Sequence, residues 1–234
     1  MLTILTLKIL LMIVYLSHWD WNLYKSRKDI VSTLDKLKFR AVCPEGTYSK
    51  DLKEIYHDYI KWEFNRKNTF DLKGVMNLKN ILNSFEKETI VHSFTLKTGI
   101  IYSITKLFVK NNFKGVLSIN GLGYLFSNNL KAKLLKFLLS GFIKRSFNKN
   151  FNEIIFQNES DKKIFLNYSN YSGKTSMIYG SGIEINNYVK KETYQAAKLK
   201  VIFVSRLLID KGVNDYIQLT QNIDKPNIDF YLAG

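Results

Sequence analysis

The stretch FVSRLLIDKGVNDY, residues 203–216, joins an apolar segment to a helical pattern through a loop that carries two cations. The apolar residues before Arg206 predict a strand, and the residues after Gly212 predict a helix. A helix start presents free backbone N–H groups, which attract anions. Arg206 adds a planar fork of donors and Lys211 adds a mobile point charge. The pattern therefore indicates a site for a diphosphate.

The same alternation of strand and helix continues along the chain, which predicts an α/β protein with doubly wound parallel sheets. Ligands in such sheets bind beyond the carboxyl ends of the strands. The predicted strands are 8–16, 39–43, 59–64, 89–94, 115–120, 153–157, 175–179, 199–205 and 228–233. The predicted helices lie near 23–37, 72–86, 98–111, 130–148, 159–168 and 213–223.

Composition limits the class of protein. Of the 234 residues, 46% are apolar and 14% are aromatic, which is enough to fill a core. The single cysteine, Cys43, excludes an internal disulfide and favours a reducing compartment. The apolar run 9–16 is much shorter than the roughly 20 residues of a bilayer span, and no cleavage site follows it. We therefore expect a cytoplasmic protein in which this run is a buried strand.

The formal net charge of +15 favours a polyanionic partner, which could be nucleic acid, a phosphorylated small molecule or an anionic membrane. A genome-wide preference for lysine and asparagine is the alternative explanation of the charge. Nucleic-acid binding is disfavoured because the aromatic residues fall mainly in core patterns of strands and helices, and no RNA-binding motif is present.

Two glycine-containing segments resemble phosphate-binding motifs only in part. SGKTS, residues 172–176, lacks the earlier glycine of a phosphate loop, because Tyr168 occupies that position, and it precedes a strand. GLGYLF, residues 121–126, has two glycines of a dinucleotide fingerprint, but Phe126 stands at the third position. Gly121 and Gly123 either permit a tight turn or allow a ligand to approach closely. Their place at a strand end favours the second interpretation.

Several segments together resemble family 4 glycosyltransferases, which have the GT-B fold of two Rossmann-like domains. The segments are HWDWNLYKSRKDIV (18–31), VHSFTLKTGIIYSI (91–104), LSINGLGYLFS (117–127), IIFQNESDKKIF (154–165), IYGSGIEINNY (178–188) and FVSRLLIDKGVNDYI (203–217). They occur in the order of one branch of that family. That branch adds N-acetylhexosamine or a related sugar to polyprenyl-diphosphate-linked saccharides in bacterial surface polysaccharide (O-antigen or capsule) synthesis.

The resemblance implies two domains and a set of site residues. Residues 1–190 would form an N-terminal acceptor-side domain, and residues 191–234 an incomplete start of a nucleotide-sugar-binding domain, so the resemblance implies C-terminal truncation. Arg206, Lys211 and Gly212 would hold the donor diphosphate, and His92 would join Arg206 and Lys211 as a catalytic residue. The acceptor cleft would include His92, Lys97, Gly121, Gly123, Asp20 and Trp21, and Gly180 and Gly182 would form a hinge or donor loop.

The resemblance also implies a retaining transferase that uses a nucleotide-sugar, expected to be UDP-linked. No Asp-x-Asp motif occurs in the chain, so we expect neither a metal clamp on the diphosphate nor a cofactor. Because 191–234 supply only one β-α-β unit, we expect residues 1–234 alone to be inactive in transfer. The alternative hypothesis is a catalytically inactive remnant that serves as an interaction domain.

The segment LKAKLLKFLLSGFIKRSF, residues 130–147, has a narrow polar stripe of Lys133, Lys136, Ser140 and Lys144 on a helical wheel. One interpretation is a crossover helix that packs on the core and exposes its lysines. The other is a helix that lies in the interface of a membrane, with its cations at anionic headgroups. The lipid-linked acceptor that the resemblance implies favours peripheral association with the inner face of the cell membrane.

Overall fold

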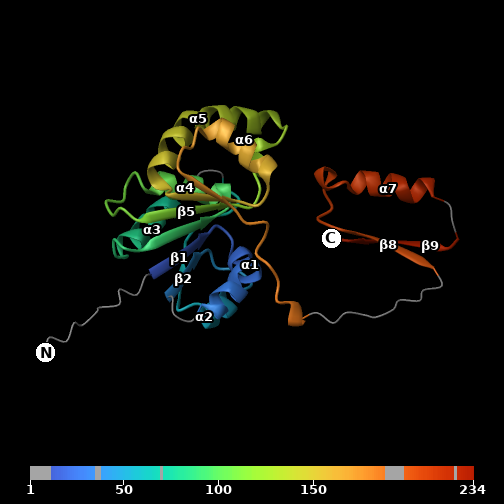
Figure 1. The fold of residues 1–234 in the computed structure, drawn as a ribbon, viewed down its shortest axis with the longest axis horizontal. Coiled ribbons are helices and arrows are strands. Elements are labelled where there is room, and N and C mark those ends of the chain that lie inside the picture. Colours follow the sequence, from blue (N-terminus) through green and yellow to red (C-terminus); the bar gives the residue numbers. More distant parts are fainter. Residues whose placement is uncertain (1–11, 35–37, 69–70, 188–197, 224–225) are drawn as a thin grey trace. The chain divides into compact units, whose positions relative to one another are not determined.

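A computed structural model describes residues 12–34, 38–68, 71–187, 198–223 and 226–234 (Figure 1). The chain divides into two compact units, Met1–Glu184 and Ile185–Gly234. The boundary predicted at residue 190 lies outside the described residues, as do the first four residues of the strand predicted from residue 8.

The described part of the first unit contains a parallel sheet of seven strands in the order β3-β2-β1-β4-β5-β6-β7. All six pairs of neighbouring strands are parallel. The strands are β1 (Met12–Ser17), β2 (Lys38–Cys43), β3 (Asp58–Lys61), β4 (Ile90–Phe94), β5 (Lys114–Ile119), β6 (Glu153–Phe156) and β7 (Lys174–Met177). The doubly wound sheet predicted from the sequence is confirmed.

The helices connect successive strands. They are α1 (Asp20–Thr33), α2 (Ser49–Ile55), α3 (Leu72–Asn83), α4 (Leu96–Thr105), α5 (Leu130–Asn150) and α6 (Glu159–Ser169), with a 3-10 turn η1 (Tyr124–Phe126) before α5. The sequence did not predict α2, because seven residues are too few to show a helical period. Within the described ranges, no helix combines the length and the apolar character needed to cross a membrane.

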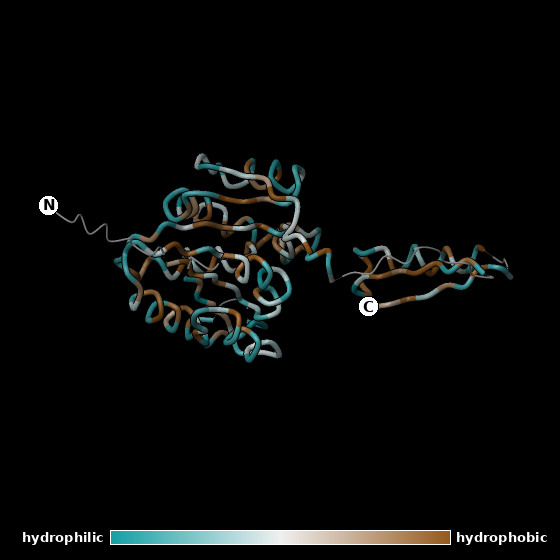
Figure 2. The backbone as a smooth tube through the Cα atoms, turned by 60° about the horizontal axis from the view of Figure 1, so that its bottom comes forward, coloured by the Kyte–Doolittle hydropathy of each residue, from teal (hydrophilic) through white to brown (hydrophobic). Residues whose placement is uncertain are grey.

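Successive side chains of each strand point to opposite faces of the sheet and build two cores. Val14 and Leu16 of β1 join the larger core, which α3, α4, α5 and α6 cover. Tyr15 points to the other face and joins a smaller core beneath α1 and α2, which also contains Cys43. Figure 1 shows α5 and α6 on one side of the sheet and α1 and α2 on the other, and Figure 2 marks the apolar residues in brown.

The second unit is a β-α-β element made of β8 (Leu199–Val204), η3 (Ile209–Lys211), α7 (Val213–Asn222) and β9 (Ile228–Ala233). β8 and β9 pair in parallel. The hydroxyl of Tyr216, on α7, lies 3.0 Å from the carbonyl oxygen of Val201 and 2.7 Å from that of Tyr231. No described side chain of α7 is fully buried. A single helix thus covers one face of a two-stranded sheet.

Gly115 of β5 lies against the end of α5, and a Cβ at this position would overlap the carbonyl oxygen of Asn150. We expect Gly115→Ala to lower the free energy of unfolding by about 2–3 kcal/mol, because β5 or α5 must shift. Gly141→Ala is the matched control, because Gly141 lies within α5 and its Cβ would meet open space. Gly141→Ala should raise the free energy of unfolding by about 0.5–1 kcal/mol. Urea unfolding measures both changes, and equal effects of the two variants would contradict this packing.

Candidate functional site

The connections of the large sheet diverge between two neighbouring strands. β1 is followed by β2 and β3 on one side, whereas β4 is followed by β5, β6 and β7 on the other. β1 and β4 pair so that their last residues, Ser17 and Phe94, lie opposite each other. In open α/β sheets this divergence creates a crevice beyond the carboxyl ends of the two strands, and ligands bind there. The residues that follow Ser17 and Phe94 are therefore the first candidates for a site.

His18 directly follows β1 and contacts the residues that follow β4. Its Nδ1 lies 3.0 Å from Oγ1 of Thr98 and 3.1 Å from Oγ1 of Thr95. Burial, with smaller contributions from the positive charges of Lys97 and Arg66, lowers the pKa of His18 to about 4. The ring is therefore neutral at pH 7. Because the threonine hydroxyls engage Nδ1, Nε2 is the ring atom that can meet a ligand.

Thr95, the residue between β4 and α4, has a strained backbone. Its φ of 76° and ψ of 150° form a conformation that a β-branched residue rarely adopts. The strain is held by two contacts: its N–H donates to the carbonyl oxygen of Ser118 at 2.9 Å, and its side chain caps α4 at the N–H of Thr98. Strained residues of this kind cluster at ligand-binding sites.

Two cations lie beside His18. Nζ of Lys97 donates hydrogen bonds to the carbonyl oxygens of Arg66 at 2.7 Å and Asn68 at 3.4 Å, which ties the loop 65–68 to the start of α4. Burial, and then the charge of Arg66, lowers the pKa of Lys97. The N-terminus of α4 adds its own partial positive charge at this place. The end of the sheet between β1 and β4 therefore suits an anionic group.

Two indole rings stand next to these cations. Trp19 and Trp21 stack with their ring centroids 5.1 Å apart and an angle of 21° between the planes. Both side chains are exposed, at 37% and 39%. The guanidinium of Arg66 lies 4.2 Å from the centroid of Trp19. Exposed, preordered aromatic rings bury large areas when they bind a ligand, and they do so with little loss of side-chain entropy.

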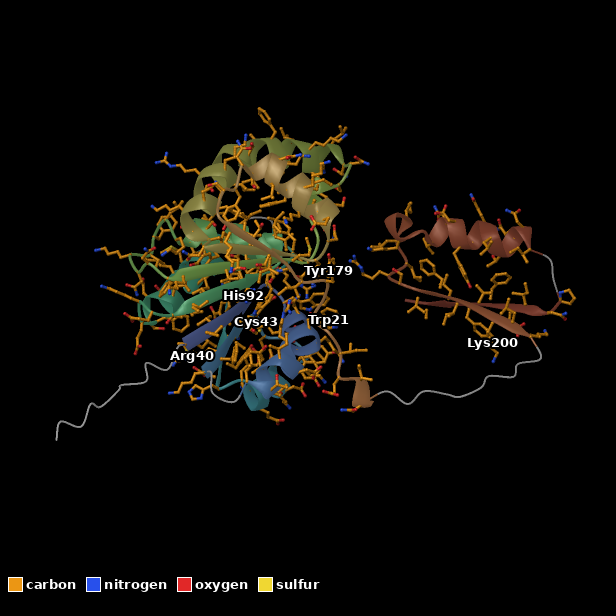
Figure 3. The ribbon with its side chains drawn as sticks, viewed as in Figure 1. Trp21, Arg40, Cys43, His92, Tyr179 and Lys200 are labelled. Carbon is orange, nitrogen blue, oxygen red and sulfur yellow. The ribbon has the colours of Figure 1, made fainter. Side chains whose placement is uncertain are left out.

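Asp20, which we expected to line the acceptor cleft, is 4% exposed. Its Oδ2 accepts a hydrogen bond of 2.8 Å from the backbone N–H of Tyr48. The carboxylate thus holds the loop between β2 and α2 against the start of α1. A contact between Asp20 and an acceptor stays a prediction, whereas Trp21, labelled in Figure 3, lies exposed on the first turn of α1.

His92, predicted at the end of its strand, instead occupies the middle of β4. Its Nε2 lies 2.8 Å from Oγ of Ser118, and its ring stacks on Phe94 with centroids 4.2 Å apart. Burial lowers its pKa to about 3, with a smaller contribution from Arg27. His92 contacts the rings of Tyr15 and Phe94, so it lies as a neutral ring on the face of the sheet that carries the smaller core. Its catalytic role stays a prediction.

The predicted glycine turns lie at strand ends of the first unit. Gly121 and Gly123 follow β5, and Gly180 and Gly182 follow β7. No heavy atom lies within 4 Å of a Cβ placed at any of these four positions. Gly123 has a φ of 61°, which other residues rarely adopt, so its turn requires glycine. The turn after β5 leaves open space beside the crevice, as a ligand approach would need.

The second unit carries the predicted diphosphate residues at its own strand end. Arg206 follows β8, and Lys211 ends the turn η3; both side chains are exposed. Gly212, with a φ of 83°, directly precedes α7, so Lys211 lies beside a helix N-terminus as the sequence predicted. Their contact with a donor diphosphate stays a prediction.

Among the described residues, no three histidine, cysteine, aspartate or glutamate side chains lie close enough together to hold a metal ion. The groups collected beyond the ends of β1 and β4 are two cations, two indoles, the neutral imidazole of His18, hydroxyls and backbone N–H groups. Cations and N–H groups bind anions, and indoles pack on sugar rings.

His18, Trp19, Arg66 and Thr98 are not among the site residues predicted from the sequence. His18 and Trp19 follow a predicted strand, so the rule that ligands bind after strand ends pointed to them. Thr98 lies in the first turn of α4, next to the predicted site residue Lys97. Arg66 reaches the site through the contact of Lys97 with its carbonyl oxygen, and no local pattern announces such a contact.

No protein-family model and no curated protein sequence matches this chain. Solved structures match it in fold. HepE from Anabaena, solved with UDP and glucose, has a TM-score of 0.63 at 14% identity, over 94% of this chain and 60% of its own. Sucrose-phosphate synthase from Thermosynechococcus elongatus has a TM-score of 0.66 at 13% identity, over 95% of this chain and 62% of its own.

UDP-N-acetylglucosamine 2-epimerase from Rickettsia bellii also matches, with a TM-score of 0.54 at 11% identity, over 95% of this chain and 62% of its own. The chain thus spans about 60% of the length of these structures. It has an α/β fold of the GT-B type, with a doubly wound Rossmann-like domain and the first β-α-β of a second one. Fold alone does not determine activity, so the function must be argued from the site.

The neutral His18 makes stability depend on pH. Its pKa is about 4 in the folded chain and about 6.5 when unfolded, so the unfolded chain binds the proton first as the pH falls. Stability should be highest above about pH 6.5 and should fall towards pH 4, with His18 contributing up to about 1.4 kcal/mol per pH unit. Urea unfolding should show a shallower decline for His18→Asn and an unchanged decline for Thr98→Ser, which keeps the hydroxyl. Equal slopes in all three proteins would exclude a buried neutral His18.

Proposed function

We propose that the protein acts in sugar transfer from a nucleotide-sugar to an anionic, saccharide-bearing acceptor. The observation that carries the proposal is the combination of stacked indoles and cations at the divergence of β1 and β4, within a fold of the GT-B type. The first unit would bind the acceptor. The second unit would contribute Arg206 and Lys211 to the donor.

The acceptor we propose is a polyprenyl-diphosphate-linked saccharide. The apolar faces of Trp19 and Trp21 can stack on a sugar ring. The guanidinium of Arg66 can grip phosphate oxygens in two places, and Lys97 can add a point charge. A neutral His18 can share a hydrogen bond with a sugar hydroxyl, because its Nε2 accepts or donates according to its tautomer. Sugar and diphosphate thus each find matching groups at one strand end.

The donor we propose is a UDP-linked N-acetylhexosamine or hexose. The bound UDP and glucose of HepE support this choice, because HepE shares the fold. As the sugar departs, negative charge grows on the diphosphate, and cations already in place lower the energy of that state. Arg206 and Lys211 can supply this stabilisation without a metal ion. We also propose that transfer retains the configuration of the sugar and that the protein acts in O-antigen or capsule synthesis. Both proposals rest on the family resemblance.

A lipid-linked acceptor would place the protein at the inner face of the cell membrane, on the cytoplasmic side. Two alternative functions can be distinguished from sugar transfer by experiment. An epimerase would change a nucleotide-sugar without any acceptor, and an inactive interaction domain would bind the acceptor without any reaction. Chromatography of a UDP-sugar incubated with and without acceptor, in a form of the protein that contains a complete second domain, separates the three outcomes. Transfer releases UDP only when acceptor is present, epimerisation gives an isomer of equal mass but different retention without acceptor, and an interaction domain leaves the UDP-sugar unchanged.

Acceptor binding can be measured through the exposed indoles. We expect a farnesyl-diphosphate-linked N-acetylglucosamine to quench the fluorescence of Trp19 and Trp21 in the 234-residue chain. Arg66→Ala should weaken binding by about tenfold or more, because a charge-assisted contact with the diphosphate is lost. Lys73→Ala, which removes an exposed lysine of α3, is the control and should bind normally. Equal affinity of Arg66→Ala and the unchanged chain would refute the acceptor site.

The donor role can be tested in a form of the protein that contains a complete second domain. There, Lys211→Ala should lower kcat by about 10²–10³-fold, as expected when one preorganised donor is removed from developing charge. Arg206→Lys should also be impaired, because the charge remains but the bidentate fork is lost. Steady-state transfer assays measure both variants. Full activity of Lys211→Ala would remove Lys211 from the diphosphate site.

A further inference from the structure

Helix α5 exposes large apolar side chains to water along its first three turns. Leu130 is 81% exposed, Leu134 61%, Phe137 78% and Leu138 66%. Their spacing places them on one face of the helix, and we call these four residues the α5 stripe. The opposite face of α5 is buried in the larger core through Ile143, Phe147 and partly buried leucines. The helix is therefore apolar on two faces, of which the sheet covers one.

Exposed cations border the α5 stripe on both sides. On a helical wheel, Lys133 and Lys144 lie along one edge, whereas Lys131 and Arg145 lie along the other. α5 contains no acidic residue. The polar stripe predicted from the sequence thus forms one border of the exposed apolar face of α5. This helix and α6 form a layer over the sheet (Figure 1).

The charge decides between the possible occupants of this surface. A second copy docked through the same stripe would bring lysines against lysines, and like charges at close range repel. A surface of anionic lipid headgroups offers the opposite charge together with an apolar layer beneath it. Long lysine side chains can then reach up to the headgroups while leucine and phenylalanine side chains enter the acyl boundary.

We propose that the α5 stripe and its bordering cations form a docking surface for an anionic membrane. The surface lies close to the candidate acceptor site, because α5 starts beside η1 on the connection that leaves the carboxyl end of β5. The carboxyl ends of parallel strands share one edge of the sheet, so His18 lies at that same edge. The inference rests on the proposed function in one respect: a lipid-linked acceptor would reach the crevice from the membrane to which the α5 stripe binds.

The experiment is co-sedimentation of the 234-residue chain with vesicles of phosphatidylglycerol and phosphatidylcholine, compared with vesicles of phosphatidylcholine alone. We expect binding to the anionic vesicles and about tenfold or more weaker binding to the neutral ones. Leu134→Gln with Phe137→Gln should reduce anionic binding by about tenfold or more, because the apolar insertion is lost. Leu72→Gln with Met76→Gln, an exposed apolar pair on one face of α3, should leave binding unchanged.

A second pair of variants tests the charge. Lys133→Gln with Lys144→Gln should weaken anionic binding by about fivefold per lysine, whereas Lys50→Gln with Lys73→Gln should have no comparable effect. Absence of binding, equal binding to neutral vesicles, or full binding by the stripe variant would each overturn the proposal. Self-association in light scattering that the stripe variant abolishes would assign the surface to a second copy instead, and would also overturn it.

The stripe variant also separates this proposal from the proposed function. Leu134→Gln with Phe137→Gln should still bind the soluble farnesyl-diphosphate-linked probe, because the substitutions lie outside the crevice. Vesicle binding without probe binding in the unchanged chain would count against the acceptor site alone. Probe binding without vesicle binding would count against the docking surface alone.

Discussion

The pairing of β1 with β4 is the contact on which the rest of the first unit depends. It sets Ser17 opposite Phe94, so the chain leaves two adjacent strands at the same level of the sheet. The following residues must then meet, and the hydrogen bonds of His18 with Thr95 and Thr98 result from this register. A shift of one residue in either strand would turn Tyr15 or Phe94 away from the smaller core and would separate His18 from Thr95 and Thr98. Core packing and site geometry are therefore enforced together.

Positive charge at the site has a second effect besides attracting anions. Burial, and then the charges of Lys97 and Arg66, lowers the pKa of His18, so the histidine contributes hydrogen bonding without adding another charge. Under the proposed function the two kinds of group would have separate tasks: the cations would neutralise phosphate, and the neutral ring and the indoles would contact the sugar. The strained Thr95 fixes the helix start on which Lys97 and Thr98 stand. A site with separate polar and aromatic parts suits a ligand that is itself part anion and part carbohydrate.

Strand periodicity predicted nine strands, and the structure has a strand at each of these places, because buried parallel strands are short apolar runs that stand out in the sequence. The helix α2 escaped prediction because its seven residues are too few to show a helical period, and Leu52 is the one apolar side chain among them that is fully buried. In the site, local pattern found Lys97, Lys211 and Gly123 at element boundaries. It did not single out His18, although this residue directly follows a predicted strand, and the catalytic role of His92 stays a prediction. Arg66 depends on folding of a distant loop, which no short motif encodes.

The smaller core gives the protein a chemical property that is unrelated to its ligands. Cys43, the one cysteine of the chain, is fully buried at the end of β2. Burial, and then the negative charge of Asp20, raises the pKa of its thiol far above neutrality. Thiolate is the form that alkylating reagents and oxidants attack, so the folded chain presents them with neither access nor a reactive form. A cysteine introduced on the surface would therefore be the sole site of modification, and slow labelling of Cys43 itself would report the opening of the sheet beneath α1 and α2.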